Sequence, residues 1–172
     1  MIKRVLRRLF GRTISKDSSS GEIISYKENA WKSTRMAEYY VDSVEHSFFD
    51  LVTAELFTNE VPPNSLILDA GAGTGRGTFA FAKLGFKVTA LDISAAMLKN
   101  IERNSDGYDI EVMEGSVFDL PFDDNSYDVV TSMDVDIHFP NWSDILAEKT
   151  RVCKPGGQII FSILNKENAD LL

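Results

Sequence analysis

The sequence predicts an α/β fold in which helices cover both faces of a mostly parallel sheet. Short β-rich runs alternate with helical segments after residue 65, and a glycine-rich turn joins the first of these runs to a helix. The 172 residues, 44% hydrophobic and 26% charged, have the composition of one globular domain. A chain of this size buries a sizeable core without disulfides, and a single cysteine excludes an internal one.

Charge and hydropathy narrow the classes of partner. Eighteen Lys and Arg residues stand against 26 Asp and Glu, and a net charge of -8 is unfavourable for a surface that binds phosphate backbones. We therefore expect no nucleic-acid partner. No apolar run approaches the roughly 18 residues of a membrane-spanning helix, so no such segment is predicted.

A short basic amphipathic helix is predicted at residues 2–10. Its apolar positions recur at helical spacing, arginines occupy the opposite face, and Gly11 ends the pattern. Three interpretations stay open: contact with an anionic membrane surface, a mitochondrial transit peptide, and a solvated terminus. Residues 15–21 are typical of a flexible linker, so we assign residues 1–25 to a segment that precedes the domain.

A helical region is predicted at residues 28–57, where apolar residues recur at three- and four-residue spacing, and Pro62 and Pro63 end the pattern. Beyond these prolines, the alternation of strands and helices favours right-handed crossovers and parallel pairing. The predicted strands are residues 66–69, 87–92, 110–113, 128–133 and 158–163. The predicted helices are residues 77–84, 95–104 and 142–153.

Residues 66–77 form the motif that indicates a binding site: an apolar strand that leads through a glycine-rich turn into a helix. Gly71, Gly73 and Gly75 allow a tight turn and let a ligand lie against bare backbone. Asp92 ends the next predicted strand about twenty residues later, where an acid accepts hydrogen bonds from both ribose hydroxyls of a nucleoside. The pattern predicts nucleoside binding at the carboxyl ends of the strands.

A dinucleotide is disfavoured as the ligand. The dinucleotide fingerprint Gly-x-Gly-x-x-Gly, begun at Gly71, requires glycine where this chain has Arg76. Asp69, at the mouth of the turn, is badly placed beside a pyrophosphate and suits a ligand with a cationic group. A nicotinamide-dependent oxidoreductase is therefore a disfavoured interpretation.

At these residues the chain resembles the class I S-adenosylmethionine-dependent methyltransferases, in the broad branch that includes ubiquinone and menaquinone biosynthesis enzymes. The resemblance covers residues 26–165 in four ordered motifs, at residues 69–75, 91–98, 115–130 and 148–157. It implies a Rossmann-like α/β fold, with residues 26–172 as the methyltransferase-like domain.

The resemblance also implies a division of this domain and a set of binding residues. Residues 26–60 correspond to a helical lid and residues 65–165 to the core that binds S-adenosylmethionine, the implied cofactor. The implied cofactor-binding residues are Asp69, Gly71, Ala72, Gly73, Gly75, Asp92, Ile93, Met97, Ser116, Val117 and Asp119.

Two features depart from the family pattern. The residue after Gly115 is usually an acid that faces the adenine amino group, whereas here Ser116 would accept that bond without charge assistance, or Asp119 would substitute. The family fold continues through two more strands, while this sequence stops soon after the predicted fifth strand. The expected sheet therefore lacks its last two strands and has an exposed edge. A truncated product, a domain completed by another chain, and an isolated fragment stay open.

Methyl transfer requires alignment and a dry site rather than a protein nucleophile. His138 follows the fourth predicted strand and is our candidate for the base that takes a proton from the acceptor, with a structural role as the alternative. Asp134 and Asp136 share its loop and are candidates to orient His138 or the substrate. A metal at this Asp-x-Asp pair would lack a third ligand in the pattern, so no metal is predicted.

The resemblance thus predicts an enzyme that transfers a methyl group in line to a small-molecule or lipid acceptor. The alternative is a non-catalytic cofactor-binding or interaction domain, whose exposed sheet edge pairs with a partner in a homo- or hetero-oligomer. The expected localisation is cytoplasmic, with membrane contact through residues 2–10 and mitochondrial import as open alternatives. Fold alone does not fix the acceptor.

Overall fold

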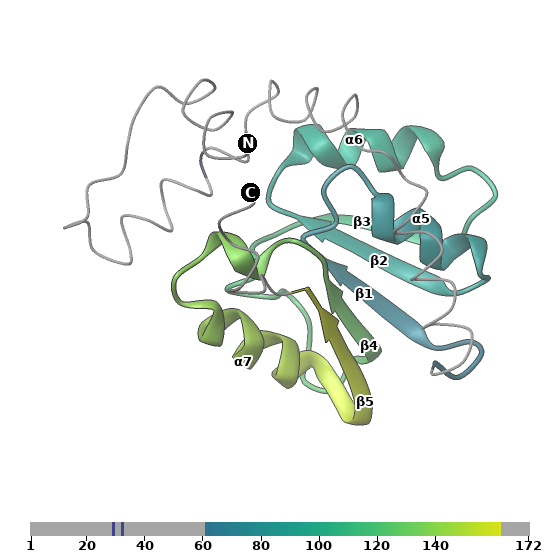
Figure 1. Cartoon of the computed structure of the whole chain (residues 1–172). Coiled ribbons are helices and arrows are strands. Elements are labelled where there is room, and N and C mark those ends of the chain that lie inside the picture. The colour runs from purple at the N-terminus through teal and green to yellow at the C-terminus, as the bar shows by residue number, and fades with distance from the viewer. Residues whose placement is uncertain (1–28, 30–31, 33–60, 163–172) are drawn as a thin grey trace, which may run out of the picture.

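The computed structural model describes residues 29, 32 and 61–162 of the chain. Within them, five strands form one parallel sheet in the order β3-β2-β1-β4-β5 (Figure 1). The strands are β1 (Leu66–Ala70), β2 (Lys87–Asp92), β3 (Ile110–Glu114), β4 (Tyr127–Ser132) and β5 (Cys153–Phe161). The strand order reverses at β1, which lies between β2 and β4. In open α/β sheets, ligands bind outside the carboxyl ends of the strands at such a switch point.

Helices cover both faces of the sheet (Figure 1). α5 (Arg76–Lys83) and α6 (Ala95–Asn104) pack on one face, and α7 (Trp142–Val152) packs on the other. α5 and α6 bury Phe81, Leu98 and Ile101 among residues of β1, β2 and β4 and of the glycine turn. α7 contributes Ile145 and Val152 to the core of the opposite face. These two apolar layers hold the sheet rigidly under the loops at its carboxyl edge.

The connections between strands differ in kind. α5 joins β1 to β2, and α6 joins β2 to β3. Residues 115–126, which join β3 to β4, form no helix and contain one isolated bridge between Ser116 and Asp119. After β4, a short 3-10 helix, η1 (Asp136–His138), precedes α7. The loops that follow β1, β2, β3 and β4 all begin at the carboxyl edge of the sheet.

The predicted fold class is confirmed, and the predicted elements between residues 66 and 152 agree closely with the observed ones. β2 and α6 have the predicted bounds, α5 differs by one residue at each end, and α7 ends one residue earlier than predicted, which is within normal fraying. The prediction did not include η1.

The predicted start of β5 is wrong. Cys153 already pairs with Tyr127, and the next pairs join Val129 to Gln158, so residues 154–157 form an irregular insertion opposite a single residue of β4. Pro155, Gly156 and Gly157 are typical of a turn, which is why the sequence placed the strand only after them. Gly157 is required here, because a Cβ would lie 2.6 Å from the carbonyl oxygen of Asp128.

Several predictions fall on residues outside the described ranges: the basic helix at residues 2–10, the linker at residues 15–21, the helical region at residues 28–57 apart from residues 29 and 32, and residue 163 at the end of the predicted fifth strand. In the described part of the chain, β5 lies at one end of the strand order. None of the helices in that part has the length and apolar character needed to cross a bilayer.

Candidate cofactor and acceptor site

The glycine turn after β1 folds back onto the end of β2. The backbone N–H groups of Gly71 and Ala72 both donate to the carbonyl oxygen of Leu91, at 2.7 and 2.9 Å. Gly71, Gly73 and Gly75 have φ values of 85°, 57° and 98°, in the left-handed region that favours glycine. The turn therefore lies against the carboxyl end of β2, where Asp92 is located.

The three glycines of the turn have different neighbours. A Cβ on Gly71 would overlap the side chain of Val135, and a Cβ on Gly75 would lie 2.7 Å from Cγ1 of Ile101. These two positions are packed closely against the protein itself. Among the described residues, a Cβ on Gly73 would meet only the Sδ atom of Met97, at 3.8 Å. Gly73 is thus the position of the turn where the described part of the chain leaves open space beside the backbone, as a bound ligand requires.

Asp92 joins the glycine turn to the start of α6. Its Oδ2 accepts a hydrogen bond from the Gly73 N–H at 2.8 Å, and its Oδ1 accepts one from the Ser94 N–H at 2.9 Å. Burial raises the pKa of this carboxyl group above its ordinary value, and hydrogen bonds from the backbone N–H groups of Ser94, Gly73 and Ile93 oppose that rise. Because a carboxylate offers about four acceptor positions, these bonds do not use all of them.

Asp69 has a different environment from the one its sequence position suggested. It is 2% exposed, its Oδ2 accepts from the Thr78 hydroxyl at 2.7 Å, and its Oδ1 accepts from the Thr131 hydroxyl at 3.2 Å. Burial is the largest influence on its pKa and raises it, while these hydroxyl bonds act in the opposite direction. In the structure, Asp69 ties β1 to α5 and β4, and both its oxygens are engaged within the protein.

The other predicted cofactor residues lie near the ends of β2 and β3. Met97 is buried beside Gly73, and Ile93 is partly buried between Asp92 and α6. Ala72 is buried against α6 and Val117 in the core under α7. Ser116 is partly buried and Asp119 is exposed.

Residues 116–119 form a tight turn at the end of β3. The Asp119 N–H donates to the carbonyl oxygen of Ser116 at 3.2 Å, and the Ser116 Oγ accepts from the Phe118 N–H at 3.2 Å. The Gly115 N–H donates to the carbonyl oxygen of Asp92 at 3.0 Å, which places this turn beside the end of β2. The structure thus brings the segments that hold the predicted cofactor residues to one edge of the sheet.

Asp134 joins the loop after β4 to the start of α5 and to the residue that follows β5. It has φ 60°, a left-handed conformation that is uncommon outside glycine, directly after β4. Its Oδ2 forms an ion pair with Arg76 at 2.9 Å, and its Oδ1 accepts from the Ser162 hydroxyl at 2.9 Å. Backbone outliers of this kind cluster at functional sites. The pair with Arg76 was not predicted, because no local sequence pattern indicates contact between residues 58 positions apart.

Asp136 is part of a buried ion pair, and its predicted role in orienting His138 or the substrate stays a prediction. Its Oδ2 accepts from the Lys149 ammonium group at 2.5 Å, and its Oδ1 accepts from the Ser132 hydroxyl at 2.8 Å. Lys149 is fully buried and lies 4.4 Å from the ring centroid of Phe161. Burial lowers the pKa of Lys149, and the neighbouring carboxylate opposes that shift.

His138 ends η1 and is partly buried. Its backbone N–H donates to the carbonyl oxygen of Val135 at 3.0 Å, so η1 fixes its position after β4. In the chain as described, no cluster of three or more His, Cys, Asp or Glu side chains has the arrangement of a metal site. The site therefore consists of the glycine turn, the ends of β2 and β3, and the loop after β4.

Comparison with protein families settles the class of this site. Residues 68–161, more than half of the chain, match the family described as "Methyltransferase domain". The chain belongs to this family. The predicted class I S-adenosylmethionine-dependent methyltransferase family is confirmed, and its cofactor is the one that the resemblance implied.

Individual methyltransferases share a part of their length with this chain. It is 39% identical over 108 residues to a glycine/sarcosine/dimethylglycine N-methyltransferase of Actinopolyspora halophila, covering 60% of this chain and 19% of that protein. It is 36% identical over 104 residues to a demethylmenaquinone methyltransferase of Bacillus licheniformis, covering 58% of this chain and 45% of that protein. The chain thus spans less than half the length of either relative.

A solved structure shows the same fold over more of the chain. A Methanococcus maripaludis protein assigned as an S-adenosyl-L-methionine-dependent methyltransferase superimposes with a TM-score of 0.64. The match covers 92% of this chain and 72% of the other at 24% sequence identity, so it supports the methyltransferase fold.

Proposed function

We propose that this chain transfers a methyl group from S-adenosylmethionine to a small-molecule acceptor. The proposal rests chiefly on one observation: the open backbone at Gly73 lies directly beside the Asp92 carboxylate, 2.8 Å from N–H to oxygen, at the carboxyl edge of the sheet. A ligand with both a ribose and a chain that lies along bare backbone fits this pair of features. A dinucleotide does not fit as well, because Arg76 stands where the dinucleotide fingerprint requires its third glycine.

Each part of the cofactor has candidate residues in this site. The free acceptor positions of Asp92 would take the ribose hydroxyls, and the backbone at Gly73 would lie along the methionine part. Ile93 and Met97 would contact the adenine ring, whose amino group would donate to Ser116 or Asp119. When bound, S-adenosylmethionine supplies an electrophilic methyl group: an acceptor lone pair forms the new bond to carbon, the carbon–sulfur bond breaks onto sulfur to leave S-adenosylhomocysteine, and the acceptor loses a proton.

His138 is the proposed base for that proton. It is held by η1 in the loop after β4, next to the glycine turn in the sheet order. The Asp134 carboxylate shares this loop and is already fixed by Arg76 and Ser162, so it would shape the acceptor side of the site. A positioned base of this kind contributes roughly 10² to 10⁴ in rate.

Two classes of acceptor deserve a direct comparison, because they are the ones named for the relatives. One is a small amine such as sarcosine, and the other is a quinone precursor such as demethylmenaquinone. Both present a nucleophile that must lose a proton during or after transfer, which agrees with a base at His138. The lipid character of the second would also account for a basic amphipathic segment at residues 2–10.

The test is transfer of a labelled methyl group from S-adenosylmethionine to sarcosine or to reduced demethylmenaquinone by the full chain. We expect transfer to one of them. His138→Gln should reduce the turnover about a hundredfold while leaving the affinity for S-adenosylhomocysteine within about twofold. Binding of S-adenosylhomocysteine without transfer to either acceptor would favour the non-catalytic cofactor-binding alternative. Equal turnover of wild type and His138→Gln would remove His138 from the mechanism.

A further inference from the structure

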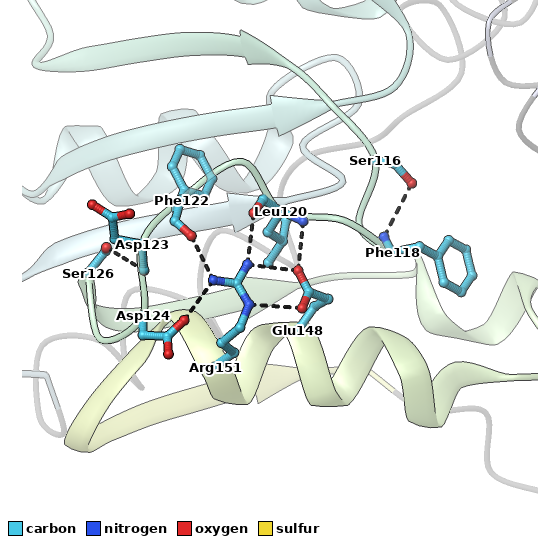
Figure 2. Close-up of polar contacts among 9 residues, drawn as sticks. All are labelled: Ser116, Phe118, Leu120, Phe122, Asp123, Asp124, Ser126, Glu148 and Arg151. Carbon is cyan, nitrogen blue, oxygen red and sulfur yellow. Dashed lines mark hydrogen bonds and ion pairs between the residues drawn. The ribbon is translucent and has the colours of Figure 1, made fainter.

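The guanidinium group of Arg151 on α7 uses every donor it has. Arginine carries five N–H groups in a planar fork, and Arg151 makes five hydrogen bonds (Figure 2). Nε and Nη2 donate to the two carboxylate oxygens of Glu148 at 2.9 and 2.8 Å. Nη2 also donates to the carbonyl oxygen of Leu120 at 2.8 Å, and Nη1 donates to that of Phe122 at 2.7 Å. The fifth bond joins Nη1 to Asp124 at 3.0 Å.

Glu148 completes the attachment from the same face of α7. Its Oε2 accepts a hydrogen bond from the Leu120 N–H at 2.8 Å, so both backbone groups of Leu120 are held by the Glu148–Arg151 pair (Figure 2). The Arg151 guanidinium lowers the pKa of Glu148, which keeps the carboxylate ionised. The two residues are three positions apart on the helix and therefore neighbours on its surface.

The segment that this pair holds has little support of its own. Residues 115–126 contain no helix and no strand longer than one bridge. The strands are held by backbone hydrogen bonds to their neighbours, whereas the Leu120 backbone is held by the side chains of Glu148 and Arg151. The outer ion pair, between Arg151 and Asp124, contributes little to stability, because Asp124 is 69% exposed. The specific effect of the Glu148–Arg151 pair is to fix the position of the Leu120 backbone.

Leu120 directly follows the turn at residues 116–119. The start of that turn is joined to β2 through the Gly115 N–H, which donates to the carbonyl oxygen of Asp92 at 3.0 Å. Its end is joined to α7 through Leu120. The turn is thus held between the backbone of Asp92, the proposed ribose-binding residue, and the Glu148–Arg151 pair.

We propose that Arg151, with Glu148, is a positioning residue: it holds the turn at residues 116–119 in the position from which the turn recognises the base of the bound nucleoside. This inference rests on the proposed function, since it requires the nucleoside of S-adenosylmethionine to occupy the site. Arg151 touches neither cofactor nor acceptor and acts through the backbone of Leu120. Lysine cannot replace it, because a single ammonium group has three donors and cannot span two backbone carbonyls and a carboxylate in one plane.

The test compares two ligands that differ only in the base: S-adenosylhomocysteine and S-ribosylhomocysteine, which lacks adenine. Calorimetry on the full chain measures both affinities for wild type, Arg151→Lys and the control Arg103→Lys, an exposed arginine at the end of α6. Arg151→Lys should weaken S-adenosylhomocysteine binding about tenfold and leave S-ribosylhomocysteine within about twofold. Arg103→Lys should change neither affinity.

These outcomes test the positioning role of Arg151 and the proposed cofactor binding separately. Wild type that binds neither ligand contradicts the proposed function. Wild type that binds, with Arg151→Lys unchanged or with both ligands weakened equally, overturns the positioning role. If circular dichroism shows that Arg151→Lys does not fold, Glu148→Gln takes its place, because glutamine keeps the size and one acceptor oxygen. It should give the same base-selective loss in smaller measure, and an equal loss for both ligands would overturn the inference.

Discussion

Gly73 and Gly85 share a left-handed backbone but differ in what surrounds them. Their φ values are 57° and 87°, and neither has a close steric neighbour within residues 61–162: a Cβ would meet Met97 Sδ at 3.8 Å in the first case and nothing within 4 Å in the second. Gly73 lies in the proposed cofactor site, whereas Gly85 lies in the turn between α5 and β2. A side chain at either position therefore carries similar strain, but only one would occupy space that the ligand needs.

Gly73→Val should weaken binding of S-adenosylhomocysteine tenfold or more, because the valine side chain prevents close approach to the backbone. Gly85→Val is the matched control. It should lower the free energy of unfolding by a similar amount, about 1–2 kcal/mol, and leave the affinity unchanged. Calorimetric titration and urea unfolding of both variants check this. Similar loss of affinity in the two variants would show that strain, rather than a ligand at Gly73, is responsible.

Asp69 gives a prediction about pH. Burial raises its pKa in the folded chain above the ordinary value of 3.8. The folded state therefore holds this proton more tightly than the unfolded state does, so the contribution of Asp69 to stability is fully present below pH 3.8 and is lost as pH rises through the raised pKa. Asp69→Asn cannot ionise and lacks this dependence.

Urea unfolding of wild type and Asp69→Asn at a series of pH values from about 4 to 8 measures the effect. The stability of wild type relative to the variant should fall as the pH increases through that range. A difference between the two proteins that does not vary with pH, or that grows in favour of wild type, would mean that Asp69 is not raised in pKa by its burial against Thr78 and Thr131.

At the scale of elements, the Lys149–Asp136 pair links α7 to η1. Lys149 is 0% and Asp136 4% exposed, so removing one partner leaves an uncompensated charge in the core. Lys149→Met should lower the free energy of unfolding by about 3–5 kcal/mol, and the double variant with Asp136→Leu should recover most of that loss. Urea denaturation of the single and double variants measures both. Lys149→Met as stable as wild type would contradict a buried, ionised pair.

The elements that the sequence predicts well are those whose signals are local. Short β-rich runs predict β1 to β4, and helical spacing predicts α5, α6 and α7. The start of β5 was missed because Pro155, Gly156 and Gly157 have the composition of a turn, while their pairing with β4 depends on a bulge that only the neighbouring strand determines. η1 was missed because a single 3-10 turn leaves no periodic pattern.

At the scale of the whole molecule, the parallel sheet and its switch point follow from the order of elements and the right-handed crossover rule. The same order brings Gly73 and Asp92 together, so the proposed nucleoside site could be predicted from sequence. The Arg76–Asp134 pair could not be predicted, because its residues are distant in sequence. The Lys149–Asp136 pair could not be predicted either, because helical periodicity gives the face of α7 on which Lys149 lies but not its partner. The burial of Asp69 could not be predicted either, since its two threonine partners come from α5 and β4.

The measurement that tests the central claim most directly is calorimetric titration of the full chain with S-adenosylhomocysteine, with NADH as the competing ligand and circular dichroism to confirm folding. The account predicts micromolar binding of S-adenosylhomocysteine and no binding of NADH, because Asp92 and the backbone at Gly73 suit a nucleoside while Arg76 replaces the third glycine of the dinucleotide fingerprint. A folded chain that binds NADH instead, or binds neither ligand, would contradict it.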